Sequence, residues 1–239
     1  MASESAYMHY KMVKTVYDDD IKIFGNKLDP KLSCRPFKMP HLLRNWPASA
    51  KWDFEHLLEN YAFRTTVIEM GRKYTDDNWK QEIMTIYEYI ELLKKQEDAS
   101  YEEYGKNGDL KSSMGMEEAV MIKRNIYFSK YYLAQNALLT QIPKLMDDID
   151  IPDLISSINP NPEINCWFGP TATFTPFHTD PKDNLFCQVY GEKYIKLKSK
   201  DDKQKIVCLL YGGESLFIPA GWQHEVLSMT KSFGVNFWV

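Results

Sequence analysis

The chain has 239 residues, of which 44% are hydrophobic and 14% aromatic, so it holds ample material for a buried core. Its formal net charge of −4 gives no broad basic field of the kind that nucleic-acid binding requires, although an acidic enzyme suits a basic protein substrate such as a histone. No stretch approaches the ~20 apolar residues that cross a bilayer, which excludes a membrane-spanning helix.

The chain start and the cysteines point to an intracellular protein. The opening sequence Met-Ala-Ser-Glu-Ser-Ala-Tyr lacks the basic stretch and apolar run of a secretory signal. The four cysteines have no paired short spacing, and three of them lie in β-like runs, so we expect buried free thiols rather than disulfides or zinc ligands. Such thiols are typical of a reducing compartment.

The first elements in the chain are short. Residues 1–34 are polar, and we expect them to wrap the outside of the domain. Further along, Asp53 begins a short helix. The apolar side chains of that helix share one face at the i, i+3, i+4 spacing: Phe54, Leu57 and Leu58.

The stretch from Arg64 to Met70 is rich in β-branched residues and predicts a strand. Glu69 interrupts its apolar character, and from the strand alone this carboxylate is equally well a solvent-facing group. A polar loop follows, in which we interpret Tyr74 and Trp79 as packing residues.

A helix is predicted to start at Thr85, because Thr85 and Glu88 have the spacing of a capping box. Its buried stripe comprises Ile86, Tyr89, Ile90 and Leu93. Residues 95–124 are charged and contain Gly and Ser, which favours a mobile loop. After residues 126–139, a connector leads to Asp153.

From Asn165 onward the runs are short and separated by Gly and Pro turn signals, without helical periodicity. Many short strands with such punctuation indicate a sandwich or a barrel. We therefore expect residues 161–239 to form a barrel and residues 1–160 to supply N-terminal strands and buttressing helices, within one domain over 1–239.

Three metal-capable side chains stand out in this C-terminal part. His178 and Asp180 are one residue apart, and His224 follows in the sequence Pro-Ala-Gly-Trp-Gln-His. A His-x-Asp tripeptide alone is weak evidence, because a chain of this length holds one by chance. Two imidazoles and one carboxylate nevertheless form the facial triad of non-haem Fe(II) oxygenases, and Mn, Ni, Co or Zn bind such a set too.

A lysine on an apolar face adds to this pattern. Lys193 follows a Gly-Glu turn and shares one strand face with Ile195 and Leu197 by parity. A buried lysine requires an anionic partner. Parity also places Asn236 on one face of the final strand with Trp238, where it can point into the barrel near the metal.

From about Arg35 to Val239, these motifs resemble the Jumonji-C family of 2-oxoglutarate-dependent oxygenases. The resemblance implies a mainly β fold with flanking helices, a double-stranded β-helix of the jelly-roll type. It also implies an entry strand and turn within residues 35–47 and a strand within residues 126–139 that faces the cofactor. It implies Fe(II) bound by His178, Asp180 and His224, and 2-oxoglutarate as cosubstrate. One departure is the connection at 198–205, which is much shorter than in similar members. Nuclear residence follows from the resemblance alone.

The resemblance also assigns roles around the metal. The far carboxylate of 2-oxoglutarate is expected at Lys193, with hydroxyl donors from Tyr132 and Thr175, and Asn184 is expected at its other end. Substrate contacts are expected at three further residues: Glu69, Gln135 and Trp167. For each of these side chains, an ordinary strand or core position is the alternative.

Three functions remain open at this point. The first is hydroxylation of an arginine in a protein substrate, because Glu69 and Trp167 suit a guanidinium. The second is lysine demethylation by hydroxylation of an N-methyl group, which needs an aromatic or oxygen-lined cage. The third is a non-catalytic cupin-like binding module, which the complete triad and Lys193 argue against.

Overall fold

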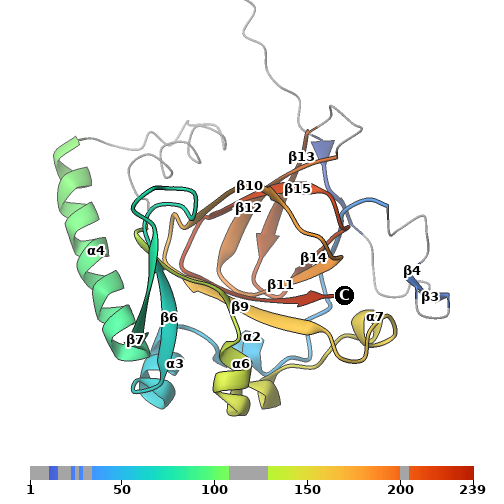
Figure 1. The fold of residues 1–239 in the computed structure, drawn as a ribbon, viewed down its shortest axis with the longest axis horizontal. Helices are drawn as coiled ribbons and strands as arrows, with labels where there is room; N and C mark the ends of the chain where they lie inside the picture. Colours follow the sequence, from blue (N-terminus) through green and yellow to red (C-terminus); the bar gives the residue numbers. More distant parts are fainter. Residues whose placement is uncertain (1–10, 16–22, 25–26, 29–33, 108–128, 200–204) are drawn as a thin grey trace, which may run out of the picture.

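The computed structural model describes residues 11–15, 23–24, 27–28, 34–107, 129–199 and 205–239. Strands dominate, and the helices lie outside them (Figure 1). The strands are β1 (Lys11–Met12), β2 (Lys14–Thr15), β3 (Ile23–Phe24), β4 (Lys27–Leu28), β5 (Phe37–Met39), β6 (Thr65–Met70), β7 (Lys80–Thr85), β8 (Tyr131–Asn136), β9 (Glu163–Gly169), β10 (Phe174–Thr179), β11 (Asn184–Tyr190), β12 (Glu192–Lys198), β13 (Lys205–Tyr211), β14 (Ser215–Ile218), β15 (Gln223–Ser228) and β16 (Ser232–Trp238). The helices are α2 (Ala48–Lys51), α3 (Phe54–Tyr61), α4 (Ile86–Asn107), α6 (Leu138–Gln141), η2 (Pro143–Asp148) and α7 (Asp153–Ser156).

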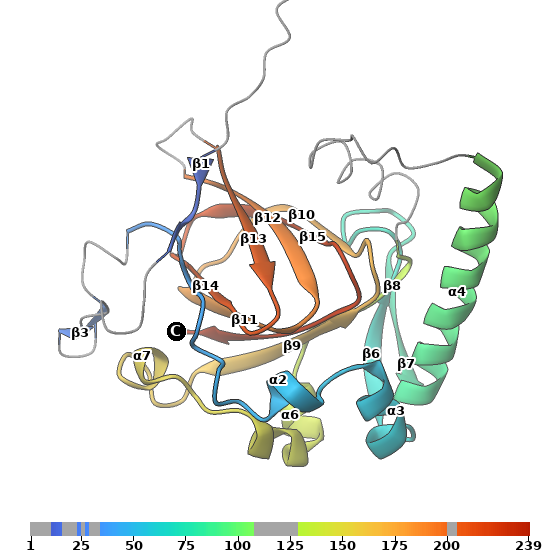
Figure 2. The same cartoon turned by 180° about the vertical axis from the view of Figure 1, so that it is seen from behind.

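Two sheets face each other to form the barrel. One has the strand order β1-β13-β12-β15-β10, and the other runs β2-β5-β14-β11-β16-β9-β8-β6-β7. Figures 1 and 2 show the first sheet above the second from opposite sides of the molecule. The two facing layers are built largely from strands after residue 163, and this confirms the predicted jelly-roll fold.

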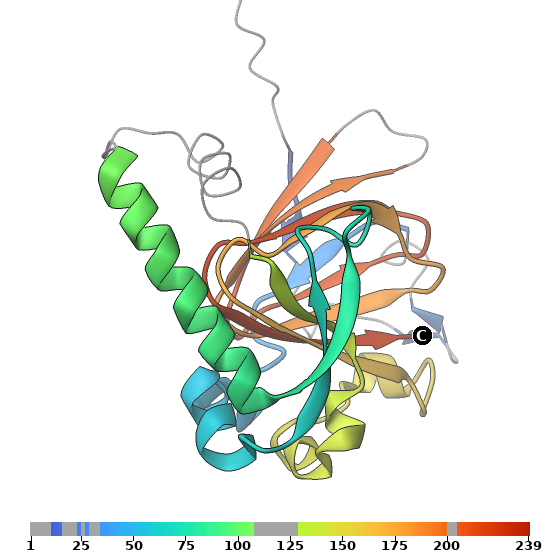
Figure 3. The ribbon, with the colours of Figure 1, turned by 60° about the vertical axis from the view of Figure 1, so that its left-hand side comes forward.

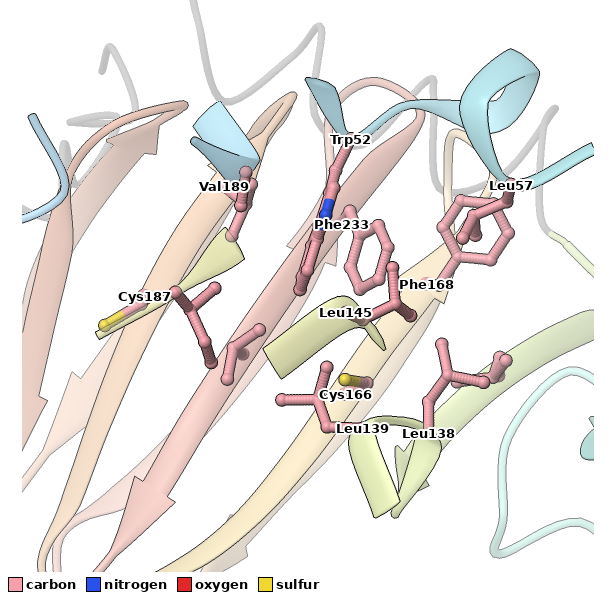
Figure 4. Close-up of a cluster of buried hydrophobic side chains, with 14 of the residues drawn as sticks. Trp52, Leu57, Leu138, Leu139, Leu145, Cys166, Phe168, Cys187, Val189 and Phe233 are labelled. Carbon is pink, nitrogen blue, oxygen red and sulfur yellow. The ribbon is translucent and has the colours of Figure 1, made fainter. Parts of the chain in front are cut away.

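The outer face of the larger sheet is covered by short helices. Figure 4 shows Trp52, which follows α2, over Phe233 of β16, and the two rings stack with centroids 4.7 Å apart. The ring centroids of Phe54 in α3 and Phe168 in β9 lie 4.2 Å apart. This buried aromatic layer holds the sheet rigid from outside, so that the inner face is left for the site.

Helix α4 begins at the predicted capping box. The backbone N–H of Glu88 donates to Thr85 Oγ1 at 3.1 Å, and the N–H of Thr85 donates to the Glu88 carboxylate at 2.8 Å. The predicted apolar stripe is buried. Figure 3 shows how α4 stands against the β6–β7 hairpin. Tyr89 from that stripe donates its hydroxyl to the backbone carbonyl of Phe168 at 2.8 Å.

The predicted loop at 95–124 is wrong for its first part, because residues 95–107 continue α4. This segment has no Gly or Pro before Gly105, so its sequence is compatible with a continuous helix. The remainder of that loop lies outside the described residues, as does most of the short connection at 198–205. The connector before Asp153 folds into α6 and η2.

The described cysteines are all free, as predicted, and three of them are buried. Burial raises the pKa of Cys166 to about 12, so this thiol stays protonated. None of the helices in the described ranges has the length and apolar character that a membrane span requires.

Candidate metal and cosubstrate site

The two histidines of the predicted triad face each other across neighbouring strands. In the antiparallel pair β10–β15, His178 lies directly opposite His224. The register shifts between Thr175 and His178, where Pro176 has no N–H to offer the ladder. The pairing explains how residues 46 positions apart in sequence come together, since 224 − 178 = 46.

Asp180 completes the group just beyond the end of β10. Its two carboxylate oxygens lie 3.7 Å from His178 Nε2 and 3.6 Å from His224 Nε2. One ligand atom from each residue lies within 4.8 Å of the others. Two imidazoles and one carboxylate at this spacing can hold one divalent metal ion and leave other coordination positions free.

The imidazole rings are held by backbone carbonyls. His178 Nδ1 lies 2.9 Å from the carbonyl of Pro176, and His224 Nδ1 lies 3.2 Å from that of Trp222. A carbonyl only accepts, so each Nδ1 carries the proton and each Nε2 keeps its lone pair toward Asp180. Burial lowers the pKa of His224 to about 4, so this ring is neutral at physiological pH, as a ligand must be.

The turns that carry Asp180 and His224 are bonded to each other. The backbone N–H of Gly221 donates to the carbonyl of Asp180 at 3.1 Å, and that of Ala220 donates to the Asp183 carboxylate at 2.7 Å. Gly221 has a φ of +81°, a conformation that glycine adopts without strain. These bonds fix the ligand-bearing turns before any ligand arrives.

The triad opens into a cavity of about 530 Å³. Ten of the eleven site residues expected from the sequence line it: Glu69, Tyr132, Gln135, Trp167, Thr175, His178, Asp180, Asn184, Lys193 and His224. Asn236 does not reach the cavity surface. It is fully buried behind the wall, where it bonds to Trp167 and Asn184.

Lys193 is the buried cation of this cavity. Only 1% of it is exposed, and its ammonium lies 3.0 Å from Ser228 Oγ and 3.3 Å from the Tyr132 hydroxyl. Within the described part of the chain, no carboxylate forms an ion pair with it. Burial therefore lowers the pKa of Lys193 to about 7. A cation held this way is ready for an anion from solution.

The opposite side of the cavity carries the expected substrate residues. Glu69 of β6 lies opposite Tyr132 of β8, and burial raises the pKa of its carboxyl group. Gln135 has a φ of +44°, which is uncommon for a residue with a side chain, and it lies where β8 shifts register against β9. Trp167 projects from β9 beside Tyr132, with ring centroids 6.0 Å apart.

Several lining residues were missed or misread from the sequence. Tyr74 and Trp79 line the cavity rather than pack in the core, and the Tyr74 ring lies 6.5 Å from that of His178. Two aromatic residues in an otherwise polar loop were the available signal. Trp238 also lines the cavity, and its parity with Asn236 could have revealed it. Nothing in the pattern singled out Ser228, which does not line the cavity but bonds to the Lys193 ammonium from behind it.

The residues fit the metal and the cosubstrate that the sequence predicts. The nitrogen and carboxylate donors suit a first-row divalent metal, and Lys193 is a buried ammonium whose hydrogen bonds, within the described ranges, go to hydroxyl groups. The cavity lining between them offers hydroxyl, amide and apolar groups. A small dicarboxylate matches this division into one metal end and one cationic end.

Comparison with known families agrees with this site. Residues 32–207 match the model of the cupin-like domain, a span that includes His178, Asp180 and Lys193. The chain belongs to this family of cupin-like domains and, within it, to the Jumonji-C proteins.

The similar proteins include Lysine-specific demethylase 8 of Xenopus tropicalis, with 29% identity over 85% of this chain and 48% of the relative. Jumonji C domain-containing protein 5 of Drosophila melanogaster is 30% identical, over 85% of this chain and 54% of the relative. Lysine-specific demethylase JMJ30 of Arabidopsis thaliana is 30% identical, over 91% and 53%. The chain spans about half the length of these relatives.

Proposed function

We propose that this chain is an Fe(II)- and 2-oxoglutarate-dependent oxygenase that hydroxylates an arginine side chain of a protein substrate. One observation carries the proposal: a complete triad and a buried lysine, which has no acidic partner among the described residues, line the same cavity. A module that only binds a partner needs neither a complete metal triad nor a buried lysine in its cavity. Membership of the Jumonji-C family supports the same class of activity.

Each end of the cavity has a role in this proposal. His178, Asp180 and His224 hold the metal, while Lys193 binds the far carboxylate of 2-oxoglutarate with help from the Tyr132 hydroxyl. Burial raises the pKa of Tyr132 far above its usual range, so its hydroxyl stays a neutral donor.

Two more polar side chains complete the cosubstrate site. Thr175 adds a second hydroxyl donor to the far carboxylate, and Asn184 binds the other end of the cosubstrate. When bound, iron with 2-oxoglutarate and dioxygen would supply the oxidation that converts a C–H bond of the substrate to C–OH, with release of succinate and CO2.

The proposed preference for arginine depends on the substrate side of the cavity. Glu69 is a carboxylate inside the cavity, where it can accept charge-assisted hydrogen bonds from a guanidinium. Trp167 and Trp79 offer ring faces on which the planar guanidinium can stack. Gln135 adds an amide at the same side.

Lysine demethylation is the second candidate, because two of the relatives above carry the name lysine-specific demethylase. The aromatic residues of the cavity could surround a methylated ammonium. The carboxylate of Glu69 distinguishes the two candidates, since an unmethylated guanidinium gains more from its hydrogen bonds.

The experiment uses matched peptides that differ at one position, which is arginine, lysine or methylated lysine. Each is incubated with the protein, Fe(II), 2-oxoglutarate and ascorbate, and the products are analysed by mass spectrometry. The proposal predicts gain of one oxygen atom by the arginine peptide without formaldehyde. Loss of a methyl group with release of formaldehyde would establish demethylation instead. If 2-oxoglutarate is not consumed with any peptide, the chain is a binding module.

A further inference from the structure

A continuous chain of hydrogen bonds links the wall of the cavity to the metal-binding carboxylate. The indole N–H of Trp167 donates to Asn236 Oδ1 at 2.8 Å. Asn236 Nδ2 donates to Asn184 Oδ1 at 3.2 Å, and Asn184 Nδ2 donates to Asp180 Oδ2 at 2.9 Å. We call these four residues the amide relay.

The direction of the amide relay is fixed at both ends. An indole N–H can only donate, so Asn236 must present its oxygen to Trp167 and its NH2 group to Asn184. Asn184 then presents its own NH2 group to Asp180, whose carboxylate oxygen accepts the bond. Turning either amide over would set two acceptors or two donors against each other. The order of donors and acceptors from Trp167 to Asp180 therefore allows only one arrangement of these side chains.

Sheet geometry explains how the relay is built. Its first three residues come from β9, β16 and β11, which are neighbours in the larger sheet. Asn236 lies opposite Asn165 on one side and Phe186 on the other, so Trp167 and Asn184 are its diagonal neighbours. Diagonal side chains in a sheet are near enough for long side chains to meet. Asn184 is 5% exposed and Asn236 0%, so water does not compete for these bonds.

From this geometry we propose that Trp167 and Asn236 are positioning residues for the metal centre. They hold the amide of Asn184 in the single orientation that donates to Asp180 Oδ2. The other oxygen, 3.7 Å from His178 Nε2, is then the one left for the metal. This inference rests on the proposed function, because it requires that Asp180 binds a metal.

Loss of the Trp167 indole N–H should make the position of the Asp180 carboxylate less well defined. Phenylalanine at 167 keeps an aromatic ring in the wall but leaves Asn236 Oδ1 buried without a donor. The amide of Asn236 is then held by Asn184 alone, so turning it over breaks one hydrogen bond instead of two. The carboxylate of Asp180 loses a fixed partner, which raises the cost of holding it in place for the metal.

The test measures Co(II) binding to the full chain without peptide or 2-oxoglutarate, from the visible absorption of the bound ion. The variants are Trp167→Phe, Asn236→Leu and the double variant. The matched control is Trp238→Phe, which removes a buried indole N–H from another residue that lines the cavity. That N–H has no hydrogen-bond partner in the described structure and lies outside the relay.

The amide relay predicts a loss of Co(II) affinity of about tenfold in Trp167→Phe and in Asn236→Leu, at the lower end of the range for residues behind a metal ligand. The double variant should lose no more than Asn236→Leu alone, because the two residues act through one chain of bonds. Trp238→Phe should bind Co(II) as the wild type does, with the same spectrum.

Three results would overturn the relay: unchanged affinity in Trp167→Phe, an equal loss in Trp238→Phe, or additive losses in the double variant. Near-ultraviolet circular dichroism checks that each variant is folded, and Asn236→Ala replaces Asn236→Leu in the cycle if the latter does not fold. Failure of the wild type to bind Co(II) would instead refute the proposed metal centre itself, so the two failures are distinguishable.

Discussion

Lys193 shows most clearly how one residue prepares the cavity for its ligand. Its ammonium is buried beside two hydroxyl groups and lies within 6 Å of two rings, 5.6 Å from the Tyr132 centroid and 5.7 Å from that of Phe186. These groups solvate a charge only in part, and its pKa is therefore lowered to about 7. A carboxylate bound next to it would restore the charged form.

This pKa predicts how 2-oxoglutarate binding depends on pH. Below pH 7 the free protein already carries charged Lys193, so affinity should be constant. Above pH 7, binding must take up a proton, and affinity should fall by about tenfold per pH unit. Calorimetric titration of 2-oxoglutarate into the Mn(II)-loaded protein between pH 6 and 9 measures this slope.

The matched control is Lys193→Met, which keeps the length of the side chain without its charge. Its affinity for 2-oxoglutarate should be more than about a hundredfold lower at pH 7 and should not vary with pH. Equal affinity in wild type and Lys193→Met would show that another group binds the far carboxylate.

Glu69 is the residue on which the proposed substrate class depends. Glu69→Gln keeps the shape and loses the charge, whereas Glu69→Lys places a second cation beside the incoming guanidinium. Hydroxylation of the arginine peptide should fall at least about tenfold in Glu69→Gln and further in Glu69→Lys. The slow conversion of 2-oxoglutarate without peptide should persist in both variants. A parallel loss of both rates would show that Glu69 is structural.

At the scale of elements, the pairing of β10 with β15 creates the metal site. Short runs between Gly and Pro turn signals predict many short strands after Asn165, but they do not state which strands are neighbours. The opposition of His178 and His224 depends on that pairing and on the register shift near Pro176. The metal ligands were therefore predictable from their residue types and from the family resemblance. Their positions in space were not.

The loops explain the main omissions on the substrate side. Tyr74 and Trp79 follow a strand whose apolar pattern is readable, yet the loop between β6 and β7 has no periodicity that indicates direction. Its two aromatic residues therefore resembled packing residues in the sequence. Parity along β12 placed Lys193 correctly on a buried face, because strands have a fixed alternation.

Gly169, at the end of β9, tests whether element packing controls the cosubstrate end of the cavity. A Cβ atom there would lie 2.6 Å from the Tyr132 ring and 2.9 Å from Thr173 Cγ2. Thr173 donates to Ser228, so both hydroxyl partners of Lys193 would shift. Gly169→Ala should weaken 2-oxoglutarate binding by about tenfold. This corresponds to a free-energy cost near the lower end of the range for overpacked sites.

The control for that variant is Gly212→Ala in a turn, where the nearest atom to the added Cβ is the carbonyl oxygen of Val189 at 3.3 Å. This substitution should leave the affinity for 2-oxoglutarate unchanged when both variants are measured by calorimetry. Equal weakening in the two variants would mean that Gly169→Ala acts by general destabilisation.

At the scale of the whole molecule, stability and ligand binding are placed on opposite faces of one sheet. The outer face is closed by helices and a layer of aromatic rings, while the inner face carries the cavity. The general fold was predictable from short strands with Gly and Pro turns. The extent of α4 was not, because its charged second half lacks the apolar stripe that marks a helix in a sequence.

This separation predicts different effects on unfolding. Trp52→Ala removes a stacked core ring and should cost about 3–5 kcal/mol in the free energy of unfolding. His178→Ala should unfold at the same denaturant concentration as the wild type without metal. Co(II) at a hundred times its dissociation constant should stabilise the wild type by about 2.7 kcal/mol and leave His178→Ala unchanged. Urea unfolding with and without Co(II) measures both effects.

The most direct test of the proposed activity is the formation of succinate from 2-oxoglutarate, followed by nuclear magnetic resonance, in the presence of Fe(II) and the arginine peptide. The wild type should form succinate in step with hydroxylated peptide. Asp180→Ala keeps the cavity and both histidines but lacks the carboxylate ligand, and its rate should fall to that of the protein-free reaction. Succinate formation by Asp180→Ala at the wild-type rate, or none by the wild type, would contradict the account.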